Sequence, residues 1–63
     1  MYTYIETKTK STNKVVNRMD VSAHHERVVM TFKNAVDNGL NFNEFTSEIQ
    51  KSDVPLEVGT LKN

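Results

Sequence analysis

Hydrophobic and polar positions alternate along the first third of the chain. Tyr2–Thr9 reads YTYIETKT, in which aromatic and β-branched residues alternate with charged ones, a pattern typical of a half-exposed strand. A turn-like cluster, Ser11–Asn13, leads into Lys14–Val21, KVVNRMDV, where the alternation resumes. Together the two stretches predict a β-hairpin.

The second stretch also admits a different structure. Three of its apolar residues fit a helical spacing, so a long helix from Asn13 to Asp37 competes with the hairpin. We favour the hairpin because Asp20 and Ser22 carry side-chain oxygens of the kind that cap a helix start. With a cap at either residue, the helix would begin only after the second strand.

From Ser22 onward the hydrophobic period changes to that of a helix. One arc of this helix collects Val21, His25, Val28, Val29, Phe32, Ala35 and Val36. Asn38 or Gly39 would end the helix by adopting a left-handed conformation. The pattern therefore predicts a helix whose apolar arc packs on the hairpin.

A second helix is predicted after Leu40. Asn41 can cap it, with Glu44 three positions on, and it should fade near Lys51–Ser52. Its apolar edge would consist of Phe42, Phe45 and Ile49. Pro55 forces the residue before it toward an extended conformation, so residues 54–63 are expected to form a short edge strand or a loose tail.

These elements predict an α+β class: a single small domain over residues 1–63. An N-terminal β-hairpin would pack on two helices, with a short C-terminal strand as a further element, in the order strand, strand, helix, helix, strand. The predicted core consists of Ile5, Val15, Met19, Val21, Val28, Val29, Phe32, Val36, Leu40, Phe42, Phe45 and Ile49.

Composition narrows the classes of function. Eight Lys and Arg residues balance eight Asp and Glu residues, so no global field draws the chain to nucleic acid or to a membrane. The absence of cysteine excludes a disulfide framework and a thiolate metal cluster. No apolar run approaches the roughly 18 residues that span a bilayer, and the N-terminus lacks the apolar core of a signal peptide, so we expect the cytoplasm. Seven asparagines with few glycines and prolines are typical of small phage or plasmid proteins.

The adjacent histidines His24 and His25 do not have the spacing of a metal site. Neighbouring residues on a helix point about 100° apart, and the positions one turn further hold Val28 and Val29. We expect His25 to be partly buried under the hairpin and His24 to be solvated. A serine at a helix cap, Ser22, already has its oxygen occupied, so no nucleophile and base are predicted. No catalytic residue, metal ligand or cofactor is expected, and the chain is predicted not to be an enzyme.

A basic cluster offers an alternative function. Lys8, Lys10, Lys14 and Arg18 follow one another with no acidic residue between Thr7 and Met19, and a basic hairpin can contact phosphates. Ala35–Ile49 loosely resembles a helix-turn-helix, with Gly39 in the turn. That resemblance implies a second helix that reads DNA, but Glu44 and Glu48 on its outward positions would repel phosphates.

The favoured function is a small non-enzymatic binding protein, of the phage or mobile-element type of regulator or inhibitor, that acts by protein–protein interaction. The residues predicted to contact the protein partner are Tyr4, Lys8, Lys10, Arg27, Met30 and Asn34. The acidic stretch from Glu44 to Glu57, set against the basic hairpin, also suits a homodimer. A nucleic-acid-binding regulator is the alternative, and neither a membrane partner nor a small-molecule substrate is expected.

Overall fold

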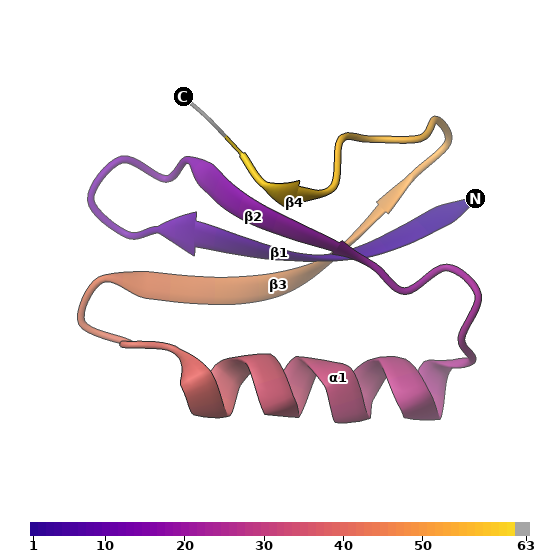
Figure 1. The fold of residues 1–63 in the computed structure, drawn as a ribbon, viewed down its shortest axis with the longest axis horizontal. Helices are drawn as coiled ribbons and strands as arrows, with labels where there is room; N and C mark the ends of the chain where they lie inside the picture. The colour runs from indigo at the N-terminus through magenta and orange to yellow at the C-terminus, as the bar shows by residue number, and fades with distance from the viewer. Residues whose placement is uncertain (62–63) are drawn as a thin grey trace.

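The computed structural model describes residues 1–61, which form a small α+β domain. Its elements are β1 (Tyr2–Thr9), β2 (Val15–Asp20), α1 (Glu26–Gly39), β3 (Phe45–Ser52) and β4 (Gly59–Thr60). The strands form one antiparallel sheet in the order β3-β1-β2-β4, and α1 runs along the side of the sheet that ends in β3 (Figure 1). No helix in this part of the chain has the length and apolar character that would let it cross a membrane.

The predicted hairpin is confirmed, and the long helix from Asn13 is excluded. β1 and β2 pair so that Ile5 lies opposite Met19 and Thr7 opposite Asn17. Asn13 closes the turn with a φ of 56°, a left-handed conformation that asparagine adopts more readily than most residues. The pairing register shifts between Thr7 and Lys8 of β1, because Thr7 pairs with Asn17 and Lys8 with Val15. Strand β2 therefore has a bulge at this point.

The helix begins at Glu26, three residues later than a cap at Ser22 predicts. The amide of Val21 still donates to the carbonyl of Thr3, and the Ser22 hydroxyl accepts from the Thr3 amide, so both residues extend the pairing along β1. Asp20 accepts from the Ser22 amide and forms a turn instead of a helix cap. His25 is left as the residue before the helix and is exposed, so the expectation that it is partly buried is wrong.

Helix α1 ends at Gly39 as predicted, but without a left-handed residue. Leu40 follows in an extended conformation, and its amide donates to the carbonyl of Asp37. Within residues 1–61, positive φ values are found only at Asn13 and Gly59. The chain therefore leaves the helix by straightening, which directs it toward β3.

The predicted second helix is wrong, because residues 45–52 form strand β3. Phe45 and Ile49 are four residues apart, a spacing that places two side chains on one face of a helix and also on one face of a strand. Asn41 does accept from the amides of Glu44 and Phe45, but the helical turn stops there. Since α1 is followed by a strand, the resemblance to a helix-turn-helix is not realised.

The core lies between α1 and one face of the sheet. Ile5, Val21 and Val29 are buried there, and Phe32, Val36 and Ile49 pack against them, as predicted. The prediction that Met19 and Phe42 belong to the core is wrong, since these residues are 42% and 50% exposed. The remainder are half-buried: Val15, Val28, Leu40 and Phe45.

The opposite face of the sheet is covered by the segment that returns from β3 to β4. Tyr4 is only 1% exposed, and its hydroxyl accepts from the amide of Leu56. Arg18 pairs with the buried Glu6 at 2.8 Å and donates to the carbonyl of Glu57 at 2.7 Å. Strand β4 then pairs with β2, so the expected short edge strand is confirmed, while residues 62 and 63 of the predicted tail lie outside the described residues.

Candidate functional site

Helix α1 covers only part of the sheet face on which it lies. The sheet has four strands only where the two residues of β4 pair with β2, and three strands elsewhere, which is roughly 14 Å at about 4.8 Å per strand. A helix with its side chains is about 10 Å across. The helix packs against β3, and its closest polar link is the hydrogen bond that Ser47 of β3 donates to Asp37. On the same face of β2, Asn17 and Met19 are exposed. On this face β2 is therefore bare at Asn17 and Met19, while Val21, which continues the strand, is buried beside Val29 of α1.

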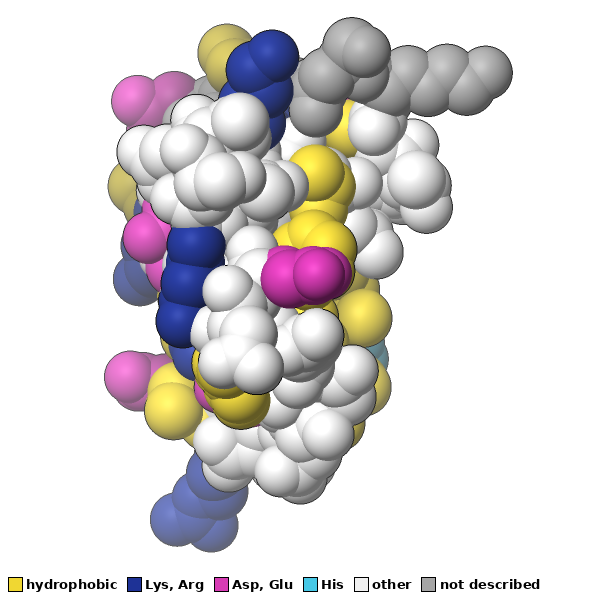
Figure 2. Space-filling model, turned by 90° about the vertical axis from the view of Figure 1, so that its left-hand side faces the viewer, with side chains coloured by type: hydrophobic (Ala, Val, Ile, Leu, Met, Phe, Trp, Pro, Cys, Tyr) yellow, Lys and Arg dark blue, Asp and Glu magenta, His cyan; other side chains and the backbone are white. Residues whose placement is uncertain are grey.

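A hollow of about 540 Å³ lies along this bare part of β2, and we call it the α1–β2 groove. Its lining comes from all four strands, from the last turns of α1 and from the residue after the helix: Thr7, Val16, Asn17, Ala35, Val36, Gly39, Leu40, Phe45 and Thr60. Figure 2 looks onto this end of the molecule and shows hydrophobic side chains gathered in a band, with an acidic side chain lying over the middle of the band and a basic side chain to one side of it. The residues that line the groove are apolar or polar and uncharged, whereas charged side chains lie close to it.

The part of α1 that lines the groove carries small residues. Ala35 and Gly39 are four residues apart, so they lie on one stripe of α1, and both are exposed. A side chain built on Gly39 would meet no atom within 4 Å. Further along the same flank of α1, Phe32 is half-buried and contacts the ring of His24 edge-on at 5.0 Å between centroids. Another chain can therefore approach this flank of the helix closely.

Hydrogen bonds to Asp37, near the end of α1, join the helix to β3. Lys33 donates to Asp37 at 2.8 Å within the helix, and Ser47 donates to the other carboxylate oxygen. Hydrogen bonds from Lys33 and then from Ser47 hold the pKa of Asp37 below its ordinary value of 3.8. At neutral pH the Asp37 carboxylate is ionised, and its hydrogen bond from Ser47 joins α1 to β3.

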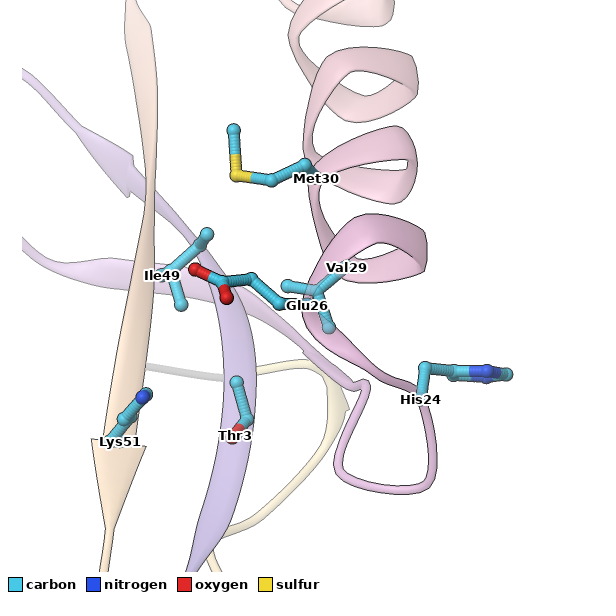
Figure 3. Close-up of a pocket in the computed structure, with 7 residues that line it drawn as sticks. All are labelled: Thr3, His24, Glu26, Val29, Met30, Ile49 and Lys51. Carbon is cyan, nitrogen blue, oxygen red and sulfur yellow. The ribbon is translucent and has the colours of Figure 1, made fainter.

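A second, smaller hollow of about 300 Å³ opens on the other flank of α1, toward the start of the helix. Figure 3 shows Met30 and Glu26 reaching from the helix toward Ile49 and Lys51 of β3, while the ring of His24 points away. Within residues 1–61, no ion pair joins Glu26 to Lys51. This cleft is charged at its rim, unlike the groove.

The residues predicted to contact a protein partner do not form one surface. Tyr4 is buried, and Lys8 pairs with Glu48, which raises the pKa of Lys8. Lys10 donates to the carbonyl of Phe42 at the hairpin end. Arg27 and Asn34 are exposed on the outer side of α1, and Met30, 46% exposed, lines the cleft beside β3.

The basic cluster is likewise divided. Lys8 and Arg18 are each paired with a carboxylate, and Arg18 is largely buried under the C-terminal segment. Lys10 and Lys14 remain exposed near the turn. Two exposed lysines give a much weaker attraction for phosphates than the four charges of the sequence predicted.

His24 and His25 are both exposed. Among residues 1–61, no group of three or more histidine, aspartate or glutamate side chains is close enough to hold a metal ion. Ser22, considered as a nucleophile, is instead bonded to Thr3 of β1.

Comparison with family models, with curated proteins and with solved structures gives no match to this chain. The interpretation of the site therefore rests on its geometry. Sequence reasoning missed the groove because Ala35, Val36 and Leu40 were assigned to packing between elements. One signal was available: Ala35 and Gly39 are small residues on one helical stripe, and a stripe of this kind leaves room for a neighbour.

Proposed function

We propose that this chain is a non-enzymatic binding protein that docks a partner protein in the α1–β2 groove. The observation that carries the proposal is the partly bare sheet face, with an apolar hollow of about 540 Å³ where a second layer would normally pack. Such a face loses contact with water when a partner covers it, and burial of apolar surface is the main source of affinity between proteins. A small protein that occupies part of a larger one in this way acts as a regulator or an inhibitor.

The lining of the groove favours a protein over nucleic acid as the partner. Among the described residues that line it, none carries a charge. Binding to nucleic acid depends on cations that neutralise phosphates, and the two lysines left exposed near the hairpin turn lie outside the groove. An apolar, uncharged surface matches the buried centre of a protein interface.

The test compares two variants of neighbouring residues on α1. Ala35→Glu places a carboxylate in the apolar groove, and Asn34→Glu places the same charge on the outer side of the helix. Both positions are exposed, so both variants should fold with unfolding free energies within about 0.5 kcal/mol of the wild type. Each protein is used to capture partners from lysate of the source cell after nuclease treatment.

We expect a stoichiometric protein partner that the wild type and Asn34→Glu retain and Ala35→Glu loses. Loss with Asn34→Glu and retention with Ala35→Glu would contradict the groove and return the site to the outer face of the helix. A partner that disappears on nuclease treatment would favour the nucleic-acid alternative.

A further inference from the structure

We propose that the outer edge of strand β3 pairs with the same edge of a second copy of this chain, antiparallel and about a two-fold axis at Gln50. This edge lies on the opposite flank of α1 from the α1–β2 groove, so the inference goes beyond the proposed function and holds or fails independently of it. Three observations carry it: an open row of backbone groups, a complementary pair of charges and the space that α1 leaves beside β3.

The two edges of the sheet differ in how they are covered. At the β2 edge, β4 pairs with Asn17 and Arg18, and the Leu61 amide donates to the carbonyl of Val16. At the other edge, β3 pairs with β1 over all eight of its residues, and no strand within residues 1–61 pairs with its outer side. Strand β3 contains no proline and no register shift against β1, which are features that protect an open edge. Such an edge is a template for another strand.

The direction of the hydrogen bonds shows which peptide groups of β3 point outward. Neighbouring residues of a strand bond to opposite sides, and the Thr3 carbonyl accepts from the β2 side. The even-numbered residues of β1 therefore bond to β3, where they meet even-numbered partners, and the peptide groups of Ser47, Ile49 and Lys51 face away from β1. The Gln50 side chain donates to the Lys51 carbonyl at 3.3 Å, a long bond that a partner strand can displace. Only odd-numbered residues can exchange hydrogen bonds between two copies, so the two-fold axis passes through a residue and not between two.

The charges select the register among those that the backbone allows. An axis at Glu48 or at Lys51 places two like charges directly opposite each other, which is unfavourable. An axis at Gln50 places Lys51 of each copy opposite Ile49 of the other. Glu26 reaches toward Ile49 from α1, and among residues 1–61 it forms no ion pair with Lys51 of its own copy (Figure 3). The pairing thus gives each Glu26 carboxylate an ammonium group from the second copy, whereas an axis at Ile49 moves that group two residues further away.

Helix α1 leaves space beside the part of β3 that would pair. Near its C-terminal end the helix is joined to β3, where Ser47 donates to Asp37. Near its N-terminal end, the hollow of about 300 Å³ lies between the helix and the side chains of Ile49 and Lys51. An axis at Gln50 brings the hollows of the two copies together and places the C-terminal ends of the two helices at opposite ends of the paired strands. The axis therefore passes through the region that α1 leaves open.

The experiment reverses the charge on each side of the proposed ion pair in the full chain. Glu26→Lys leaves a lysine at both positions, and Lys51→Glu leaves a glutamate at both. Each variant alone faces a like charge across the axis, whereas a mixture of the two can form a mixed dimer in which both ion pairs are restored. Both residues are exposed, so circular dichroism should show the wild-type fold. Lys14→Glu, exposed near the hairpin turn, makes the same change in net charge as Lys51→Glu and is the matched control.

Sedimentation equilibrium measures the dissociation constant of each protein. We expect the wild type and Lys14→Glu to approach twice the monomer mass as the concentration rises. Glu26→Lys and Lys51→Glu should each dimerise about tenfold more weakly, and their mixture should regain the wild-type affinity. Amide hydrogen exchange at Ile49 should slow as the dimer forms, because its amide would donate to the second copy.

Four results would overturn the proposal. The first is a wild type that stays monomeric at every concentration, and the second is a pair of single variants that dimerise as tightly as the wild type. The third is a mixture that is no tighter than the single variants, since restored charges would then bring no gain. The fourth is a dimer in which exchange at Ile49 is unchanged, since the contact would then lie away from the edge of β3.

Discussion

Tyr4 illustrates how one residue's role depends on a distant part of the chain. It alternates with Ile5 on β1, so the sequence places it on the face away from the helix, where it was expected to contact a partner. The segment after β3 folds back over that face, and Leu56, 52 residues later, donates its amide to the Tyr4 hydroxyl at 2.9 Å. No local pattern in the first strand contains that information, because the covering segment is neither a helix nor a long strand.

The Tyr4 hydroxyl should be needed to hold the C-terminal segment. Tyr4→Phe keeps the ring but leaves the Leu56 amide without its acceptor, at a cost of about 1 kcal/mol in the free energy of unfolding. Amide hydrogen exchange should be faster at Leu56 in this variant than in the wild type, with residues of α1 unchanged as the internal control. Unchanged exchange at Leu56 would mean that the hydroxyl does not hold the segment.

The buried pair of Glu6 and Arg18 should be costly to break from one side. Glu6 is only 4% exposed, so Arg18→Met leaves a carboxylate buried without a cation, at a cost of about 3 kcal/mol. Replacing both residues, with Glu6→Leu added to Arg18→Met, should recover most of that loss because no buried charge remains. Denaturant titration measures both values, and a double variant no more stable than the single one would contradict this account.

At the scale of elements, the hairpin was predictable and the strand β3 was not. Alternation over Tyr2–Thr9 and over Lys14–Val21, with a turn cluster between them, favoured the hairpin over the long helix from Asn13. In residues 41–52 the apolar residues are spaced by three and four, and Phe45 with Ile49 satisfies both a helix and a strand. What decides the outcome is pairing: β1 offers a free edge along its whole length, and residues 45–52 complete the sheet there. Such long-range pairing overrides the local cap at Asn41.

The link between α1 and β3 should make the stability of the fold depend on pH in acid. The pKa of Asp37 is lowered in the folded state, so its contribution is complete above the unfolded value near 3.8 and is lost as the pH falls through the folded pKa. Asp20 adds to the same decline, because hydrogen bonds from the side chain and backbone of Ser22 lower its pKa. We expect the unfolding free energy to fall below pH 4, and less steeply in Asp37→Asn. Identical slopes for the two proteins would show that Asp37 does not contribute.

The last residue of α1 should tolerate a larger side chain. Gly39 has an ordinary helical position and open space around it, so Gly39→Ala should raise the unfolding free energy by about 0.5–1 kcal/mol, since it restricts the unfolded chain. Gly59, by contrast, has a φ of +89°, so Gly59→Ala should lower it. Thermal or denaturant unfolding compares the two, and a loss of stability in Gly39→Ala would be inconsistent with the open space at this site.

In the molecule as a whole, the helix covers only part of one sheet face, and the proposed docking site lies in the part left open. The sequence led us to expect two helices over the hairpin, which would have covered both halves of the face. Since residues 45–52 join the sheet instead, the sheet becomes wider and residues 1–61 provide one helix to cover it. The bare part is the direct result of that exchange, and the groove that we propose as the docking site exists because of it. The sequence alone therefore did not predict the site, because it did not show that residues 45–52 form a strand.

Methyl NMR of the full chain, with and without the captured partner, tests whether the partner binds in the α1–β2 groove. We expect the largest shift changes at Val16, Val36 and Leu40, which line the groove, and small ones at Val54 and Val58, which are exposed on the C-terminal segment. Shift changes concentrated at Val54 and Val58, with the groove methyl groups unaffected, would contradict the account.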